Sequence, residues 1–149
     1  MITNVLVAVD DSPASLAGVQ LAIELAATAG ATLSAVAVAP DQPVVEWDAR
    51  SRPQPLQRAA SRLLDYVSRL ARQAGVPIVT TLVEGEPARC ILDHARAVAA
   101  DVIVVGRSAQ PGPGQPYIGS QTRHVVEFAE APVIVVPPSR RPAPESDDA

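Results

Sequence analysis

The chain has 149 residues, 48% of them hydrophobic, and a formal net charge of −4 from 12 basic against 16 acidic residues. This length and hydrophobic content suit one well-buried domain, and the acidic balance gives no support to general nucleic-acid binding. No apolar stretch is long enough to span a membrane, and we find no pattern of a secretory leader. The single cysteine, Cys90, has no partner for an internal disulfide. We therefore expect a cytoplasmic protein.

The first elements in chain order are a predicted strand and a predicted helix. Residues 5–9 form a continuous apolar run, which is typical of a strand buried on both faces of a parallel sheet, and Asp10 follows this run directly. Ser12 followed by Pro13 is a strong helix start, because a serine hydroxyl caps a helix and proline suits its first position. Gly30 is expected to end this helix.

The middle of the chain continues the alternation. Residues 33–38 predict a second strand, and the Pro- and Arg-rich stretch after it, which contains Trp47, predicts a surface loop. Apolar residues at helical spacing over residues 56–74 predict a second helix, whose arginine-rich opposite side we interpret as a solvated face. Residues 76–83 predict a third strand, and Pro87 starts a third helix. The residues expected to face inward on that helix are Ile91, Leu92, Ala95, Val98 and Ala99.

The last elements are a strand, a loop, a helix and a strand. Residues 102–105 predict a fourth buried strand that ends at Gly106. A stretch rich in Ser, Gln, Pro and Gly follows, after which Ser120 is expected to cap the fourth helix. Residues 133–136 predict a fifth strand.

Strands that alternate with helices predict an α/β fold, here a five-stranded parallel doubly wound sheet with helices on both faces. We expect this domain to occupy residues 1–137, and the proline-rich, acidic residues 138–149 to form a disordered tail. Ligands of such sheets bind beyond the carboxyl ends of the strands, where the strand order reverses. If the first and fourth strands flank that point, Asp10 and the loop after Gly106 face each other, but the strand order cannot be read from the sequence.

The segment from Gly106 to Ser120 is the strongest candidate for ligand binding. Glycines let backbone N–H groups approach a ligand, and the free amides of a helix start attract anions. We therefore expect the ligand to contain a phosphate group. All basic residues are arginines, which excludes a Walker-type loop and argues against a receiver domain, because both need a lysine. Gly112 and Gly114 lie among prolines rather than directly after a strand, which excludes a dinucleotide fingerprint.

Four motifs in the chain resemble those of the universal stress protein family. Residues 9–12 match the V-D-x-S pattern that ends the family's first strand, and residues 85–91 match G-x-P-x-x-x-I. Residues 100–106 are similar to the family's A-D-L-I-V-M-G, and residues 132–136 are similar to its closing P-V-L-V-V. The resemblance extends in order from residue 5 to residue 136.

The resemblance implies a five-stranded, adenine-nucleotide alpha-hydrolase-like domain. Many members bind ATP or AMP through G-x-x-G, nine residues and then G-S or G-T. This spacing is kept at Gly106, Ala109, Gly119 and Ser120, with alanine in place of the second glycine. If that glycine serves close backbone approach or a positive φ, Ala109 obstructs a phosphate; if φ is ordinary, alanine is tolerated.

The resemblance also implies roles for individual residues. Asp10 would contact the ribose hydroxyls or a magnesium ion that accompanies ATP, and Ala8 and Val38 would border the adenine. The phosphates would be held by Gly106, Arg107, Ala109, Gly119, Ser120 and Gln121. Considered from the residues alone, Asp10 is equally well explained as a cap of the turn after the first strand, and Arg107 as a solvated loop arginine.

The resemblance further implies a homodimer that pairs the last strands edge to edge. The residues of that strand are Val133, Ile134, Val135 and Val136. A strand edge is a template for pairing with another chain, so this inference has a physical basis.

The sequence gives little support to catalysis. There is no nucleophile elbow and no justified Ser-His-Asp order, and His94 and His124 have no partners at metal-ligand spacing. Cys90, beside apolar neighbours, is interpreted as an unreactive buried residue. We therefore expect a nucleotide-binding stress-response regulator with at most weak ATP hydrolysis. One alternative, motivated by Ala109 and the proline-rich loop, is a protein-interaction dimer without nucleotide binding; a weaker one is a nucleotide-dependent enzyme.

Overall fold

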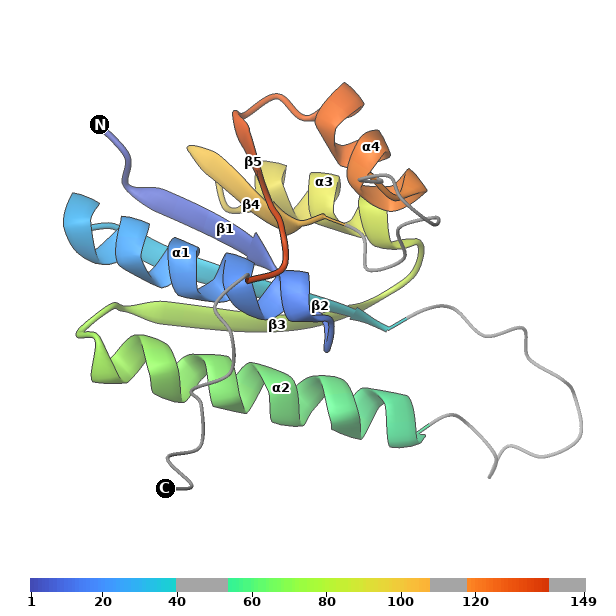
Figure 1. The fold of residues 1–149 in the computed structure, drawn as a ribbon, viewed down its shortest axis with the longest axis horizontal. Helices are drawn as coiled ribbons and strands as arrows, with labels where there is room; N and C mark the ends of the chain where they lie inside the picture. The colour runs from blue at the N-terminus through green and yellow to red at the C-terminus, as the bar shows by residue number, and fades with distance from the viewer. Residues whose placement is uncertain (40–53, 108–117, 140–149) are drawn as a thin grey trace, which may run out of the picture.

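The computed structural model describes residues 1–39, 54–107 and 118–139 (Figure 1). Its elements, in chain order, are β1 (Asn4–Ala8), α1 (Pro13–Ala29), β2 (Thr32–Ala39), α2 (Gln54–Gln73), β3 (Ile78–Glu84), α3 (Pro87–Ala97), β4 (Val102–Gly106), α4 (Ser120–Phe128) and β5 (Val133–Val136). Trp47, Ala109 and residues 140–149 of the predicted tail lie outside the described residues. The domain bounds 1–137 therefore stay a prediction.

The five strands form one parallel sheet in the order β3-β2-β1-β4-β5. The predicted doubly wound fold is confirmed. From β1 the chain moves outward through β2 to β3, and it then returns to the other side of β1 for β4 and β5. The strand order consequently reverses between β1 and β4, which is where ligands bind in sheets of this kind.

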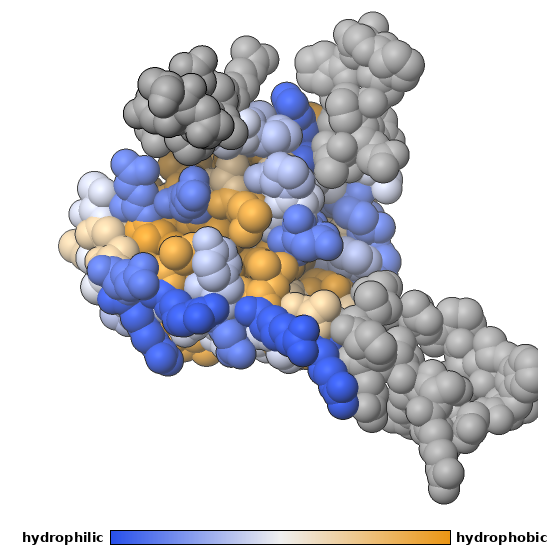
Figure 2. Space-filling model, turned by 60° about the horizontal axis from the view of Figure 1, so that its bottom comes forward, coloured by the Kyte–Doolittle hydropathy of each residue, from blue (hydrophilic) through white to orange (hydrophobic). Residues whose placement is uncertain are grey.

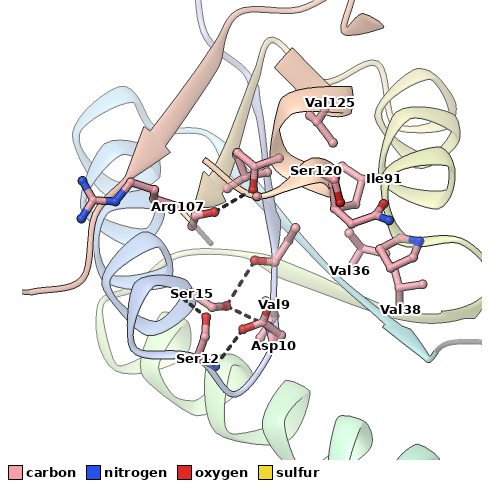
Figure 3. Close-up of a pocket in the computed structure, with 17 residues that line it drawn as sticks. Val9, Asp10, Ser12, Ser15, Val36, Val38, Ile91, Arg107, Ser120 and Val125 are labelled. Atoms are coloured by element: carbon pink, nitrogen blue, oxygen red, sulfur yellow. Dashed lines mark hydrogen bonds between the residues drawn. The ribbon is translucent and has the colours of Figure 1, made fainter. Parts of the chain in front are cut away.

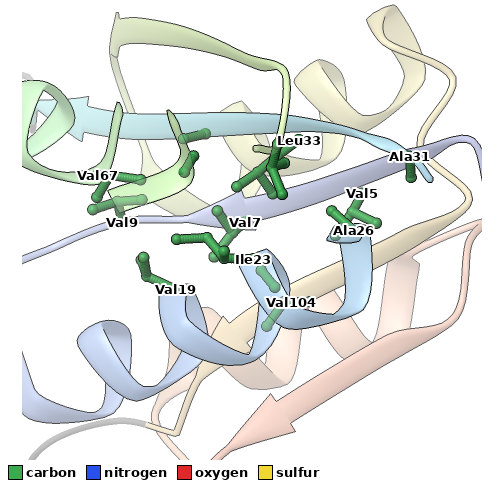
Figure 4. Close-up of a cluster of buried hydrophobic side chains, with 14 of the residues drawn as sticks. Val5, Val7, Val9, Val19, Ile23, Ala26, Ala31, Leu33, Val67 and Val104 are labelled. Atoms are coloured by element: carbon green, nitrogen blue, oxygen red, sulfur yellow. The ribbon is translucent and has the colours of Figure 1, made fainter. Parts of the chain in front are cut away.

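Alternate residues of each strand feed two hydrophobic cores. Val5 and Val7 point to the face covered by α1 and α2, where they pack with Val19 and Val67 (Figure 4). Leu6 points to the opposite face, which α3 and α4 cover. Because both faces of the central strands are buried, these strands read as continuous apolar runs.

The predicted helix starts and ends are partly confirmed. The Ser12 hydroxyl accepts a hydrogen bond from the Ser15 amide, and Gly30 ends α1 in the left-handed region at φ 65°. The prediction that Ser120 caps α4 is wrong, because Gly119 is the cap and Ser120 is the first helical residue. Ala99, predicted to face inward, is exposed because α3 ends at Ala97.

The surface separates apolar from hydrophilic side chains. Figure 2 brings forward the side where α2 lies and shows apolar side chains in the middle of that face, bordered by hydrophilic ones. Among the described side chains of α2, Leu64, Val67 and Ala71 are buried, and the arginines are exposed as expected. The buried stripe is therefore shifted from the one that the sequence predicts, which consists of Leu56, Ala60, Leu63, Val67, Leu70 and Ala74. Among the described helices, none is long and apolar enough to cross a membrane.

Candidate functional site

A cavity of about 360 Å³ lies at the carboxyl ends of the central strands, where the strand order reverses. Eight of the nine predicted site residues line it: Ala8, Asp10, Val38, Gly106, Arg107, Gly119, Ser120 and Gln121. The ninth, Ala109, lies outside the described residues. The fold thus gathers around one cavity residues that lie up to 113 positions apart, from Ala8 to Gln121.

Asp10 is held by the first turn of α1 (Figure 3). Its Oδ1 accepts a hydrogen bond from the Ser12 amide at 2.7 Å, and its own amide donates to the Ser15 hydroxyl at 2.8 Å. The Ser15 hydroxyl in turn donates to the Ala8 carbonyl oxygen at 3.4 Å. Asp10 therefore does cap the turn after β1, and this cap fixes an exposed carboxylate at the rim of the cavity.

Sequence reasoning missed Ser15, although a signal for it exists. Ser15 is 2% exposed, and its own amide donates to the Ser12 hydroxyl at 3.1 Å. The pattern that marks it is a second serine three residues after a helix cap, where an aspartate precedes the cap and follows the end of a strand. A buried hydroxyl needs a partner, and here the partners are the backbone groups of the Asp10 turn.

Gly106 is a glycine because the start of α1 packs against it. A Cβ on Gly106 would lie 2.8 Å from both the Ala14 carbonyl carbon and the Ser15 nitrogen, distances that real Cβ atoms essentially never show. The Gly106 carbonyl oxygen accepts a hydrogen bond from the Thr122 hydroxyl at 3.0 Å, which ties the end of β4 to the start of α4. Thr122 also lines the cavity, and the sequence pattern did not single it out.

The start of α4 presents backbone amides to the cavity. Gly119, Ser120 and Gln121 all line it, and Gly119 has an extended conformation with φ −62° and ψ 160°. The first N–H groups of a helix have no partner within the helix, so they can bind an anion. The Gln121 side chain has a different task, because its Oε1 accepts a hydrogen bond from the Ala88 amide at 2.9 Å and so caps the start of α3.

Arg107 lines the cavity, but its charged guanidinium group is directed away from the other lining residues. In Figure 3 the guanidinium group points away from Asp10 and Ser120. Its backbone amide donates to the Val136 carbonyl oxygen at 2.7 Å, which continues the pairing of β4 with β5. The guanidinium consequently does not face the space between Asp10 and α4.

The remaining wall of the cavity is apolar. Val36, Val38, Ile91 and Val125 line it from β2, α3 and α4 (Figure 3). Val36 is 0% exposed and Val125 is 1% exposed, so these side chains form a rigid surface. The cavity therefore combines an apolar wall, one carboxylate and a helix start, which suits a ligand with an apolar ring system, hydroxyl groups and an anionic group.

Cys90, His94 and His124 do not line this cavity. Cys90 is half-buried rather than buried, and its thiol donates to the Glu84 carbonyl oxygen at 3.6 Å. Burial lowers the pKa of His94. His124 is exposed and packs against Phe128 in a tilted arrangement, with 4.8 Å between the ring centroids. Within the described residues no three metal-ligating side chains come together.

Comparison with known proteins identifies the family. The sequence pattern of the universal stress protein family matches residues 1–137. The chain belongs to the universal stress protein family. A universal stress protein of Methanocaldococcus jannaschii is 30% identical over 139 residues, which cover 89% of this chain and 81% of the relative.

Solved structures agree with this family membership. A universal stress protein of Archaeoglobus fulgidus in complex with dAMP is 26% identical, with a TM-score of 0.71, covering 91% of this chain and 99% of that one. A universal stress protein in complex with cAMP is 25% identical, with a TM-score of 0.74, covering 93% of this chain and 99% of that one. Two structural neighbours of this chain thus bind adenine nucleotides.

Proposed function

We propose that this universal stress protein binds an adenine nucleotide and acts as a regulator in the stress response. The observation that carries the proposal is the cavity between β1, β4 and the start of α4, which is lined by Asp10, Gly106 and Ser120. The complexes of family relatives with dAMP and cAMP support the same ligand class. The working form is a nucleotide-responsive dimer rather than an enzyme.

The ligand's parts match the parts of the cavity. Val38 and Ala8 would border the adenine, and the Asp10 carboxylate would accept hydrogen bonds from the ribose hydroxyls or hold a magnesium ion with ATP. The phosphate would be bound by two parts of the chain. One is the backbone around Gly106 and Arg107 with the segment that contains Ala109, and the other is the set of amides of Gly119, Ser120 and Gln121. A helix start stabilises an anion by about 0.3–1 kcal/mol, so several amides must act together.

The first test is to denature freshly purified protein and identify any released nucleotide by chromatography. The melting temperature is then followed with added AMP or ATP, since a ligand at a hundredfold excess over its Kd stabilises a fold by about 2.7 kcal/mol. A released or stabilising adenine nucleotide supports the proposal. No release and no shift would favour the alternative of a dimer that binds protein partners only. The cytoplasmic location stays a prediction.

A further inference from the structure

A second hollow lies at the opposite edge of the sheet from the cavity that Asp10 lines. It measures about 530 Å³ and lies where α3 and α4 end and where β4 and β5 begin. The connections at this edge of the sheet, residues 30–31, 74–77, 98–101 and 129–132, are all described. Residues 40–53, 108–117 and 140–149 instead each come after the carboxyl end of a strand. The walls of this hollow are therefore built from described residues.

The hollow has an apolar floor and an exposed aromatic side chain beside it. Ile103 is 1% exposed and packs in one buried cluster with Leu92 and Ala95, and all three line the hollow. Phe128, the single phenylalanine of the chain, ends α4 and lines the hollow while it is 59% exposed. The His124 ring packs against Phe128 and supports it from one side. An exposed aromatic side chain beside an apolar hollow is typical of a protein interface.

The ionisable groups around this floor carry an excess of negative charge. Arg96 Nε lies 3.4 Å from Glu130 Oε1, and Arg96 Nη1 lies 3.8 Å from Asp93 Oδ1. Asp101 also lines the hollow, and the amino group of Met1 is near enough to act on its carboxylate. Three carboxylates thus meet one guanidinium and one amino group, on a chain whose formal net charge is −4.

This charge balance favours a different protein over a second copy as the occupant. Two copies that met at the hollow would bring together two surfaces with the same excess charge, which disfavours their association. A segment that carries arginine or lysine meets the opposite charge instead. An apolar side chain of such a segment would remove Phe128 from water.

We propose that this hollow docks a basic, amphipathic segment of a partner protein. An aromatic or large aliphatic side chain of the segment packs against Phe128 and Leu92, and flanking arginine or lysine side chains pair with Glu130 and Asp101. The apolar contact supplies most of the affinity, and the charged contacts orient the segment. Because the hollow and the Asp10 cavity lie at opposite edges of the sheet, this inference does not depend on nucleotide binding.

The test starts from a phage-displayed library of random 12-residue peptides that is selected on the immobilised full chain. The Kd of synthetic copies of the selected peptides is then measured by fluorescence anisotropy. We expect these peptides to combine arginine or lysine with an aromatic or large aliphatic residue, and to bind more weakly at 0.5 M than at 0.05 M NaCl, because salt screens charged contacts. A selection that yields no binding peptide, or only peptides without basic residues, overturns the proposal.

Two pairs of variants locate the surface that the selected peptides occupy. Phe128→Ser should weaken their binding at least tenfold, whereas Val79→Ser, which removes a 58% exposed apolar side chain from β3, should change it less than twofold. Glu130→Arg should also weaken binding at least tenfold, whereas Glu24→Arg makes the same charge change at an exposed position of α1 and should alter it less than threefold. Circular dichroism checks that each variant is folded. Peptides that bind Phe128→Ser and Glu130→Arg as tightly as the natural chain would contradict the proposal, because they would occupy another surface.

Discussion

At the scale of single residues, two glycines on either side of the interface between α1 and the sheet have opposite surroundings. Gly106 ends β4, and a Cβ there would lie 2.8 Å from backbone atoms of Ala14 and Ser15. Gly18 lies inside α1, and a Cβ there would meet Val104 Cγ1 at 3.6 Å, which is ordinary contact. The first glycine is required by packing, and the second is not.

Gly106→Ala should lower the free energy of unfolding by about 1–3 kcal/mol, because the methyl group forces apart two backbone segments. Gly18→Ala, the matched control, should raise it by about 1 kcal/mol, because alanine is the better helix former and space is present. Urea unfolding of both variants measures the two effects. If both variants changed the free energy of unfolding by the same small amount, α1 would not approach the end of β4 as closely as the 2.8 Å distances indicate.

At the scale of elements, the end of α3 uses an unfavourable residue. Ala99 has φ 50°, the left-handed conformation that glycine adopts at Gly30 and Gly75, where φ is 65° and 71°. The Ala100 amide donates to the Ala95 carbonyl oxygen at 2.9 Å, which closes the helix end and fixes this conformation. The left-handed conformation costs a non-glycine residue roughly 1–2 kcal/mol of stability.

Ala99→Gly should therefore raise the free energy of unfolding by about 0.5–1 kcal/mol, the relief of strain being partly offset by the greater freedom of glycine in the unfolded chain. Gly75→Ala performs the reverse exchange at an open position, where a Cβ has nothing within 4 Å, and should lower stability by about 1 kcal/mol. Thermal unfolding monitored by circular dichroism checks both signs. A destabilised Ala99→Gly would contradict the assigned backbone conformation.

The carboxylate of Asp101 links the starts of β1 and β4 by hydrogen bonds, and the stability that these bonds contribute should depend on pH. Asp101 Oδ2 accepts hydrogen bonds from the Thr3 amide at 2.8 Å, the Thr3 hydroxyl at 3.0 Å and the Asn4 amide at 2.9 Å. These bonds, the Thr3 amide first, lower the pKa of Asp101. Stability from a carboxyl group whose folded pKa is depressed is fully present above its unfolded pKa of about 3.9 and is lost as pH falls through the folded pKa.

The stability difference between the natural chain and Asp101→Asn should accordingly be constant from pH 7 to pH 5 and shrink below about pH 4. Urea unfolding across this range measures it. Asp93→Asn serves as the control, since Asp93 forms an exposed ion pair with Arg96 at 3.8 Å, and exposed pairs contribute little to stability. A difference that stayed unchanged down to pH 3 would mean that the protonated carboxyl holds the strands together equally well.

At the scale of the whole molecule, the fold could be predicted because its elements depend on local patterns, whereas the site residues were implied by the family resemblance, and eight of those nine residues line the cavity. The apolar runs, Ser12 and Gly30 identify elements through periodicity and capping, and the motif spacing identifies the loop after Gly106. The contacts that complete the site join distant segments, such as Gln121 with Ala88 and Thr122 with Gly106. These contacts depend on how closely the helices pack against the sheet, and this packing cannot be predicted from local sequence patterns.

Assembly is the remaining question at this scale, and the edge of β5 offers a direct test of the predicted homodimer. The carbonyl oxygen of Pro132 accepts a hydrogen bond from the Ile103 amide in β4, and that of Val136 accepts one from the amide of Arg107, the residue after β4. Because backbone groups alternate along a strand, the N–H and C=O groups of Val133 and Val135 point to the outer edge of the sheet. Two copies that pair their β5 strands would bond through these groups.

Val135→Pro removes one outward N–H while leaving the groups that face β4 in place, and proline is tolerated on edge strands. We expect the natural chain to sediment as a dimer at micromolar concentration and Val135→Pro to sediment as a monomer with a similar circular dichroism spectrum. Val135→Thr keeps the N–H and the branched shape, so it should remain dimeric. A natural chain that is monomeric at this concentration would refute the predicted dimer, and a dimer that survives Val135→Pro would place the interface on another surface.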